Sequence, residues 1–326
     1  MDKYIITGAA GNLAKELVSK LQSLGKEIVA IDICKPPQGS NTNWHQIDVT
    51  DYQTLEKVIA RFLPDCIIHM ASLLSISSES NPSKAWKINA DASINLLELS
   101  SKYKIRKFFF PSTVATYGGK LPDLLPEDYP QWPDNIYGVT KVAVERAGTY
   151  FSQSRGVDFR SVRLPIVISP YAPPGAVSAY ASHSFLAAGS KKVFTFPVSS
   201  EVSLSCIHIK DVINGIIKLI NSPAELLTRK VYNLHGFKAS AGDIKNSITQ
   251  YIPDFSATFE PKELEMKILS PQPGTFIDDS ARNDWGWDPQ YDLAATTLEL
   301  LDKTTSNNQT FYGFALINSV SIQFLI

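Results

Sequence analysis

The sequence predicts an α/β protein in which helices cover both faces of a mainly parallel β-sheet. Short apolar runs alternate with amphipathic segments along the first half of the chain, as is typical of parallel strands joined by helices. A glycine turn follows the first apolar run, and the alternation breaks after Pro165. A chain of 326 residues with 44% hydrophobic content can bury a large core. We therefore expect one large doubly wound domain that carries a smaller lobe.

The first half of the chain predicts five strands that alternate with helices. The strands are short runs in which apolar residues predominate, and the helices carry apolar residues at intervals of three and four. Gly25 ends the first helix, and a loop rich in Pro, Gly and Asn at residues 36–43 follows the second strand. The predicted strands are residues 3–7, 27–32, 66–70, 107–110 and 159–163, and the predicted helices are residues 13–24, 51–62, 83–103 and 136–154.

The second half has shorter, more interrupted elements. A proline-rich loop covers residues 170–175, and Ser240 with Asp243 forms a capping box that predicts a helix up to residue 250. Residues 231–234 are expected to return to the main sheet as a late strand. We assign residues 1–168 mainly to the sheet domain, residues 169–303 mainly to the smaller lobe with late sheet strands interleaved, and residues 304–326 to a tail of unassigned role.

Composition argues against several classes of protein. A net charge of -1 and a pI near 6.5 provide no field that would attract nucleic acid or an anionic membrane. The three cysteines lie far apart without metal-ligand spacing, so we expect free thiols, a cytoplasmic location and no metal. Residues 3–7 predict a core strand rather than a signal peptide. Residues 311–326 are apolar but interrupted, and they are shorter than the roughly 20 residues of a membrane span. We expect that tail to dock as a strand or an oligomer contact.

The glycine turn predicts a site for a dinucleotide. Gly8 and Gly11 lie between the first strand and the first helix, and Ala14 provides the third small position. In such a turn, backbone N–H groups and the helix N-terminus, here at Asn12 and Leu13, meet a pyrophosphate. A glycine pattern is weak by itself, but this one follows a strand and precedes an amphipathic helix. The alternative is an ordinary tight turn.

Asp32 supports the same interpretation. It ends the second strand, about 20 residues after the glycine turn, where an acidic side chain accepts hydrogen bonds from the adenosine ribose hydroxyls. A carboxylate there also repels a 2′-phosphate. No arginine lies in the turn or directly after Asp32, although Lys35 is near. The sequence therefore predicts NAD rather than NADP.

Tyr137 and Lys141 are the candidate catalytic pair. Residues four apart share a face of a helix, here the predicted helix 136–154. We expect the ammonium to favour the phenolate and to lower the pKa of Tyr137 from about 10 towards working pH. Such a pair can move a proton to or from an alcohol or carbonyl oxygen. Ser112 and Thr113 follow a predicted strand at the edge where ligands bind; their hydroxyls either bind a substrate oxygen or merely cap the strand.

As a set, these residues resemble the extended short-chain dehydrogenase/reductase family from residue 3 to about residue 302. The resemblance implies a Rossmann-type NAD-binding domain with a smaller C-terminal substrate-binding lobe. The residues that carry it are Gly8-x-x-Gly11-x-x-Ala14, Asp48-Val49, His69-Met-Ala71, Asn89, Ser112-Thr113, Tyr137 with Lys141, Arg163-x-Pro165 and His208-Ile-Lys-Asp211.

The resemblance also implies roles for residues that local chemistry leaves open. Asp48 and Val49 would hold the adenine, and Ala71 would lie along the cofactor phosphates and ribose. Asn89 counts among the cofactor-binding residues, and the backbone at Pro165 would meet the nicotinamide carboxamide. Lys141 would bind the nicotinamide ribose, and Thr113 would orient the substrate oxygen. His69, by contrast, is expected to be structural.

Within that family the chain is similar to L-threonine 3-dehydrogenases of the short-chain type. Their substrate-facing positions correspond here to Ser75, Ser178 and Tyr180. One departure is clear, because those enzymes carry Gly-Thr-Thr-Asp-Tyr-Ala where this chain has Ala176-Val-Ser-Ala-Tyr-Ala181. A loop without that acid and one hydroxyl should hold a zwitterion less well, since each charge-assisted hydrogen bond contributes roughly 1.5–3 kcal/mol.

The sequence favours an NAD-dependent enzyme that transfers hydride between nicotinamide and a small secondary alcohol or ketone. Nucleotide-sugar epimerases, dehydratases and ketoreductases share the catalytic pair, but their usual asparagine is Ile166 here, and their acidic pair after the catalytic threonine is absent. A non-catalytic NAD-binding protein is the third interpretation. Such a protein would have no need of the phenol.

We also expect a homodimer. The predicted helices 83–103 and 136–154 are long enough to pair with their copies across a two-fold axis, and the family resemblance implies a four-helix contact of this kind.

Overall fold

A computed structural model describes residues 2–173 and 176–306. Its main sheet has seven strands, all parallel to their neighbours, in the order β11-β7-β5-β4-β1-β2-β3. The strands are β1 (Lys3–Thr7), β2 (Glu27–Asp32), β3 (Asn43–Gln46), β4 (Cys66–His69), β5 (Lys107–Thr113), β7 (Asp158–Leu164) and β11 (Val231–Asn233). The predicted strands are confirmed. β3 was not predicted, because this edge strand, Asn-Trp-His-Gln, lacks an apolar run.

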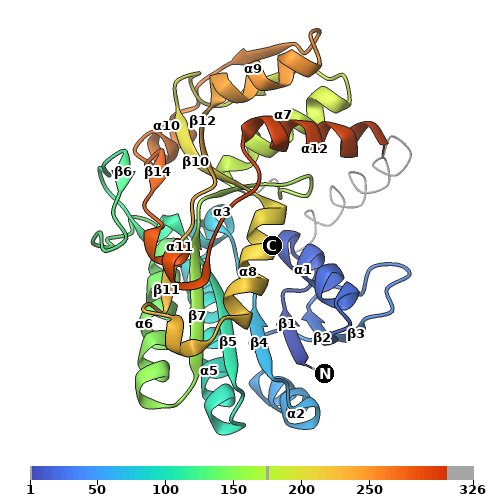
Figure 1. The fold of residues 1–326 in the computed structure, drawn as a ribbon, viewed down its shortest axis with the longest axis vertical. Coiled ribbons are helices and arrows are strands. Elements are labelled where there is room, and N and C mark those ends of the chain that lie inside the picture. The colour runs from blue at the N-terminus through green and yellow to red at the C-terminus, as the bar shows by residue number, and fades with distance from the viewer. Residues whose placement is uncertain (1, 174–175, 307–326) are drawn as a thin grey trace.

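Alternate residues of the central strands point to opposite faces, and helices bury both faces (Figure 1). Ile6 and Ile68 belong to a core cluster with α1 (Asn12–Ser23) and α8 (Ile209–Asn221). Ile5 and Ile67 pack in a second cluster on the other face. The helices that contribute to that second cluster are α2 (Tyr52–Phe62), α5 (Ala92–Lys102) and α6 (Ile136–Ser154). The doubly wound fold class is therefore confirmed.

The predicted helix 83–103 is not regular throughout. It begins as α4 (Pro82–Ala85), widens into a π-helical segment (Trp86–Asp91) and continues as α5. π-helical turns often occur at functional sites, and this one contains Asn89. An amphipathic pattern does not distinguish the wider turn from an α-helix, so the sequence could not predict it.

A smaller lobe with its own apolar core lies beyond one end of the main sheet (Figure 1). The predicted capping box is present, with Ser240 and Asp243 at the start of α9. The chain returns from this lobe to the main sheet at β11, which pairs with β7 as expected. The elements of the lobe are β8 (Ile166–Ile168), β10 (Ser203–His208) and β12 (Phe237–Ser240) in one sheet, β9 (Phe194–Phe196) and β13 (Ala257–Phe259) in another, with α7 (Tyr180–Gly189), α9 (Ala241–Tyr251), α10 (Glu263–Leu269) and α12 (Leu293–Ser306).

Among the residues that the structure describes, no helix has the length and apolar character needed to cross a membrane. The same residues contain no group of three or more His, Cys, Asp or Glu side chains arranged to hold a metal ion. The expectation for the apolar segment 311–326 lies outside the described residues.

Candidate active site

The glycine turn packs directly against the end of β4. Gly8 has φ +66°, and a Cβ added to it would lie 2.6 Å from the backbone nitrogen of Ala71 and 2.8 Å from the carbonyl carbon of Met70. Only glycine fits there without displacing backbone. α1 begins at Asn12 with Gly11 as its N-cap, and no side chain caps the helix. Its first N–H groups can therefore serve a pyrophosphate, which is the feature that the dinucleotide prediction required.

Asp32 joins the end of β2 to this turn. One carboxylate oxygen accepts a hydrogen bond from the Ala10 N–H at 2.9 Å, and the other accepts from the Cys34 N–H at 2.9 Å. The carboxylate lies beside the turn, at the position expected of the ribose-binding acid. Ala14 is buried against the sheet, as the close helix–strand contact requires, and Leu13 packs beside the same core.

The other expected cofactor residues follow strands at the same edge of the sheet, and they differ in burial. Val49 is buried and Asp48 is exposed, with its carboxylate accepting hydrogen bonds from Thr50. Pro165 is buried between β7 and β8. Asn12 instead accepts a hydrogen bond from the Ser169 hydroxyl at 2.7 Å, so its side chain ties α1 to the chain after β8.

Asn89 supports the site through the backbone. Its side-chain oxygen accepts from the Leu73 N–H at 2.8 Å, and its amide nitrogen donates to the Leu73 carbonyl at 3.0 Å. The π-helical segment thereby holds the stretch between Ala71 and Ser75. In this structure the side chain contacts protein groups, and its contribution to the site is to position that stretch.

Tyr137 and Lys141 lie on the first two turns of α6, and the Lys141 ammonium is 5.5 Å from the centre of the Tyr137 ring. Asn135 caps the helix by accepting from the Gly138 N–H at 2.7 Å. Lys141 is 3% exposed and donates to the Pro111 carbonyl at 3.0 Å. The predicted phenol–ammonium pair is thus assembled at the end of β5.

The pKa values of this pair correct the sequence analysis. Burial raises the pKa of Tyr137 to about 12, and burial lowers the pKa of Lys141 to about 7, against an opposing effect of the Glu145 charge. The expected lowering of the phenol pKa was therefore wrong for the protein by itself. Desolvation disfavours the charged form of both groups, and for Lys141 it outweighs the opposing effect of the Glu145 charge. Tyr137 consequently holds its proton at neutral pH.

Thr113 and Ser112 have different surroundings although they are adjacent. The Thr113 hydroxyl oxygen accepts from the Ala115 N–H at 3.2 Å and keeps its own proton available, and the side chain is half-buried. The Ser112 hydroxyl is buried and donates to Glu145 at 2.5 Å. Thr113 is therefore the hydroxyl that can meet a substrate oxygen. Glu145 was not predicted as part of the site, although it continues the four-residue spacing of Tyr137 and Lys141.

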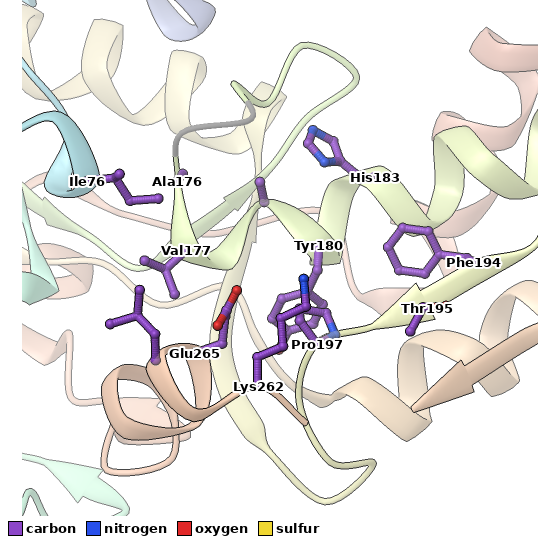
Figure 2. A pocket seen from close by; sticks show the side chains of 12 residues that line it. Ile76, Ala176, Val177, Tyr180, His183, Phe194, Thr195, Pro197, Lys262 and Glu265 are labelled. Atoms are coloured by element: carbon purple, nitrogen blue, oxygen red, sulfur yellow. The ribbon is translucent and has the colours of Figure 1, made fainter. Parts of the chain in front are cut away.

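A cavity of about 280 Å³ lies between α3, α7, β9 and the start of α10, and most of its lining belongs to the smaller lobe (Figure 2). Tyr180 lines it, whereas Ser178 does not. Ser75 begins α3 (Ser75–Ser80), whose next residue, Ile76, enters the cavity. Figure 2 shows the lining residues, which are Ile76, Ala176, Val177, Ala179, Tyr180, His183, Phe194, Thr195, Pro197, Lys262, Leu264 and Glu265.

α3, which lines the cavity with Ile76, is joined to α6. The Glu79 carboxylate of α3 accepts from the Ile136 N–H at 2.7 Å, and Ile136 directly precedes Tyr137. Lys262 and Glu265 reach the cavity from the start of α10. Sequence analysis gave no signal for these two, because they are distant in sequence from every motif.

Comparison with known proteins identifies the family of this chain. The sequence profile of the NAD dependent epimerase/dehydratase family matches residues 4–234. An uncharacterized epimerase/dehydratase of Staphylococcus saprophyticus is 35% identical over 310 residues, which are 93% of this chain and 97% of that protein.

Solved structures of L-threonine dehydrogenases share the whole fold. The enzyme from Clostridium difficile is 32% identical with a TM-score of 0.90, over 94% of this chain and 98% of that one. L-threonine 3-dehydrogenase from Trypanosoma brucei is 32% identical with a TM-score of 0.89 over the same shares. These likenesses, with the glycine turn and the Thr113–Tyr137–Lys141 arrangement in place, establish that the chain belongs to the NAD dependent epimerase/dehydratase family.

Proposed function

We propose that this protein is an NAD-dependent oxidoreductase that transfers hydride between nicotinamide and a small secondary alcohol or ketone. The observation that carries the proposal is the convergence of Thr113, Tyr137 and Lys141 at the carboxyl edge of the sheet that also bears the glycine turn. A protein that only bound the dinucleotide would have no need of a phenol and an ammonium at that edge.

In the proposed oxidation, Thr113 donates a hydrogen bond to the substrate oxygen, and Tyr137 removes the proton of the substrate hydroxyl. An oxidised nicotinamide held at the glycine turn would supply the hydride acceptor for that carbon and a positive charge. That charge favours the phenolate and so opposes the desolvation that keeps Tyr137 protonated. Lys141 holds the Pro111 carbonyl and stands over the Phe110 ring, which keeps its ammonium beside the phenol. Reduction follows the same path in reverse.

We propose NAD as the cofactor on the evidence of Asp32. Its carboxylate stands beside the glycine turn, with both oxygens oriented by backbone N–H groups. A fixed negative charge at that place accepts ribose hydroxyls and repels a 2′-phosphate. Tighter binding of NADPH than of NADH would contradict this choice.

For the substrate we propose a small polar alcohol whose non-reacting end lies in the cavity of Figure 2. A volume near 280 Å³ is at the lower end of the roughly 300–1,000 Å³ typical of small-molecule sites. Val177 and Ala179 line one part, and the charged side chains Lys262 and Glu265 line another. A short molecule with polar ends fits this lining. L-threonine, the substrate named for the structural relatives, is one member of that class.

The deciding experiment is a screen of NAD⁺ reduction, followed by the absorbance of NADH. The panel contains L-threonine, other small hydroxy acids, β-hydroxyacyl thioesters and sugar nucleotides. Turnover of a hydroxy acid supports the proposal, whereas turnover of sugar nucleotides alone would assign the chain to nucleotide-sugar chemistry. The Tyr137→Phe variant should lose about a hundred-fold or more in kcat while it still binds NAD. Unchanged turnover in that variant would contradict the catalytic role of the phenol.

We further propose that the protein forms a homodimer through the outer face of α6. Val139 and Tyr150 on α6 and Trp86 in the neighbouring π-helical segment are large apolar side chains that the single chain leaves exposed. Light scattering at micromolar concentration should give twice the mass of one chain. A monomeric mass would refute the proposal.

A further inference from the structure

Thr113 lies on β5 and Tyr137 lies on α6, so their alignment depends on the contacts that fix α6 against β5. Tyr137, Lys141 and Glu145 follow one another at intervals of four along α6 and therefore share the face that packs on β5. Lys141 binds the carbonyl of Pro111, two residues before Thr113. Glu145, one helical turn later, accepts the hydroxyl of Ser112, directly before Thr113.

Glu145 is itself held in place from the neighbouring strand. Its carboxylate is fully buried and receives a two-point contact from Arg163, with Nε to Oε1 at 3.0 Å and Nη2 to Oε2 at 2.8 Å. Gln131 donates to the same carboxylate at 3.0 Å. Arg163 stands opposite Ser112 in the pairing of β5 with β7. Ser112 on β5 and Arg163 on β7 therefore join two adjacent strands to Glu145 on α6.

The far side of Arg163 is also fixed. Its Nη1 donates to the hydroxyl of Tyr117 at 2.7 Å, and that hydroxyl donates to the side-chain oxygen of Asn233 at 3.2 Å. Every polar atom of Glu145 and Ser112 thus has a protein partner in this network. A buried charge pair whose hydrogen bonds are all made holds one geometry, and removal of a single partner loosens it.

The first turn of α6 approaches the same segment without any side chain between. A Cβ on Gly138 would lie 2.0 Å from the carbonyl oxygen of Ala115, two residues after Thr113. Because no side chain separates the two backbones, a displacement of the strand end should displace Tyr137 by a similar distance. Reacting groups must be aligned closely, because a displacement near 1 Å can cost about a hundred-fold in rate.

We propose that Ser112, Glu145 and Arg163 form a buried clamp that aligns the Thr113 hydroxyl with the Tyr137 phenol for the reaction. The three are positioning residues, since none of them lines the cavity and their side chains hydrogen-bond protein groups. This inference rests on the proposed oxidoreductase function. For Ser112 it stands in place of the two roles expected from the sequence, which were to bind a substrate oxygen or to cap the strand.

The test compares two serine-to-alanine variants in adjacent strands. Ser112→Ala removes one tether of the clamp and leaves the Glu145–Arg163 pair in place. Ser161→Ala is the matched control, because Ser161 is buried in β7 and its hydroxyl has no hydrogen-bond partner among the described residues. Ser112→Thr restores the hydroxyl. Tyr137→Phe is measured in parallel.

We expect Ser112→Ala to lose about ten- to a hundred-fold in kcat, with KM and the Kd for NAD within about two-fold of the unmodified protein. Amide hydrogen exchange should accelerate at residues 113–116, and Ser112→Thr should recover most of the rate. Ser161→Ala should change neither kcat nor the amide exchange at residues 113–116.

Unchanged kcat and unchanged exchange in Ser112→Ala would overturn the clamp, as would a loss of rate fully explained by weaker NAD binding. If Tyr137→Phe also keeps its turnover, the proposed catalytic function fails instead. Amide hydrogen exchange needs no substrate. In that case, faster exchange at residues 113–116 in Ser112→Ala would still support the clamp, and unchanged exchange would still contradict it.

Discussion

Replacement of Gly8 by alanine should weaken NAD binding strongly while leaving the fold intact. The added methyl group would lie 2.6–2.8 Å from three backbone atoms of Met70 and Ala71, which is about 0.6–0.8 Å inside the 3.4 Å at which ordinary contact begins. Neither backbone segment can rotate away as a side chain could. The turn or the end of β4 must therefore shift by a comparable distance, and the N–H groups at the start of α1 move with the turn.

The size of the effect follows from the hydrogen bonds that are lost. Each bond between a backbone N–H and a charged phosphate oxygen contributes roughly 1.5–3 kcal/mol. Loss of one such bond weakens NAD binding about ten- to a hundred-fold, and loss of two weakens it about a hundred-fold or more. In addition, alanine in the left-handed region costs about 1–2 kcal/mol of stability.

Gly25→Ala is the matched control. Gly25 has φ +69°, close to the +66° of Gly8, but no atom lies within 4 Å of its added Cβ. Both variants should therefore incur the same left-handed backbone cost in thermal unfolding, and Gly8→Ala should lose further stability from its clash. Only Gly8→Ala should weaken NAD binding, as measured by calorimetry. Equal NAD affinity in the two variants would refute the steric argument.

Three further predictions follow from charged or buried groups. Asp32→Asn should lower the preference for NADH over NADPH, measured as the ratio of the two Kd values, because the repulsive charge is gone; an unchanged ratio would contradict the role given to Asp32. Lys141→Met should abolish turnover yet raise the free energy of unfolding at pH 7 by roughly 1–3 kcal/mol, since it removes an ammonium whose pKa burial lowers to about 7; a less stable variant in urea titration would count against this. Burial lowers the pKa of His69 to about 3, so between that pH and about 6.5 the unfolded chain binds a proton that the folded chain excludes. The free energy of unfolding should therefore decrease as the pH is lowered below about 6.5. Between pH 7 and pH 5, His69→Gln should lose about 2 kcal/mol less of that free energy than the unmodified protein; equal losses would show that His69 is not responsible.

Much of the fold was predictable because it depends on local patterns. Apolar runs and helical spacing located the strands and helices of the main sheet, apart from the polar edge strand β3 and the π-helical turn around Asn89. The site residues Gly8 and Tyr137 were also predictable, because a strand–glycine–helix turn and a four-residue spacing carry their chemistry in a short stretch. His69 was expected to be structural, and it is buried between the hydroxyls of Thr7 and Ser93.

The sequence by itself determined which chemical groups are present and the order in which the elements follow one another. Tertiary structure alone decided what surrounds those groups. The pKa of Tyr137 rises rather than falls because packing removes its water, and no spacing along the chain measures desolvation. The Ser112 hydroxyl donates to Glu145 because the register of β5 against β7 and the face of α6 bring the two side chains together. Burial and contacts between distant residues arise only when the chain packs, so these properties belong to the fold.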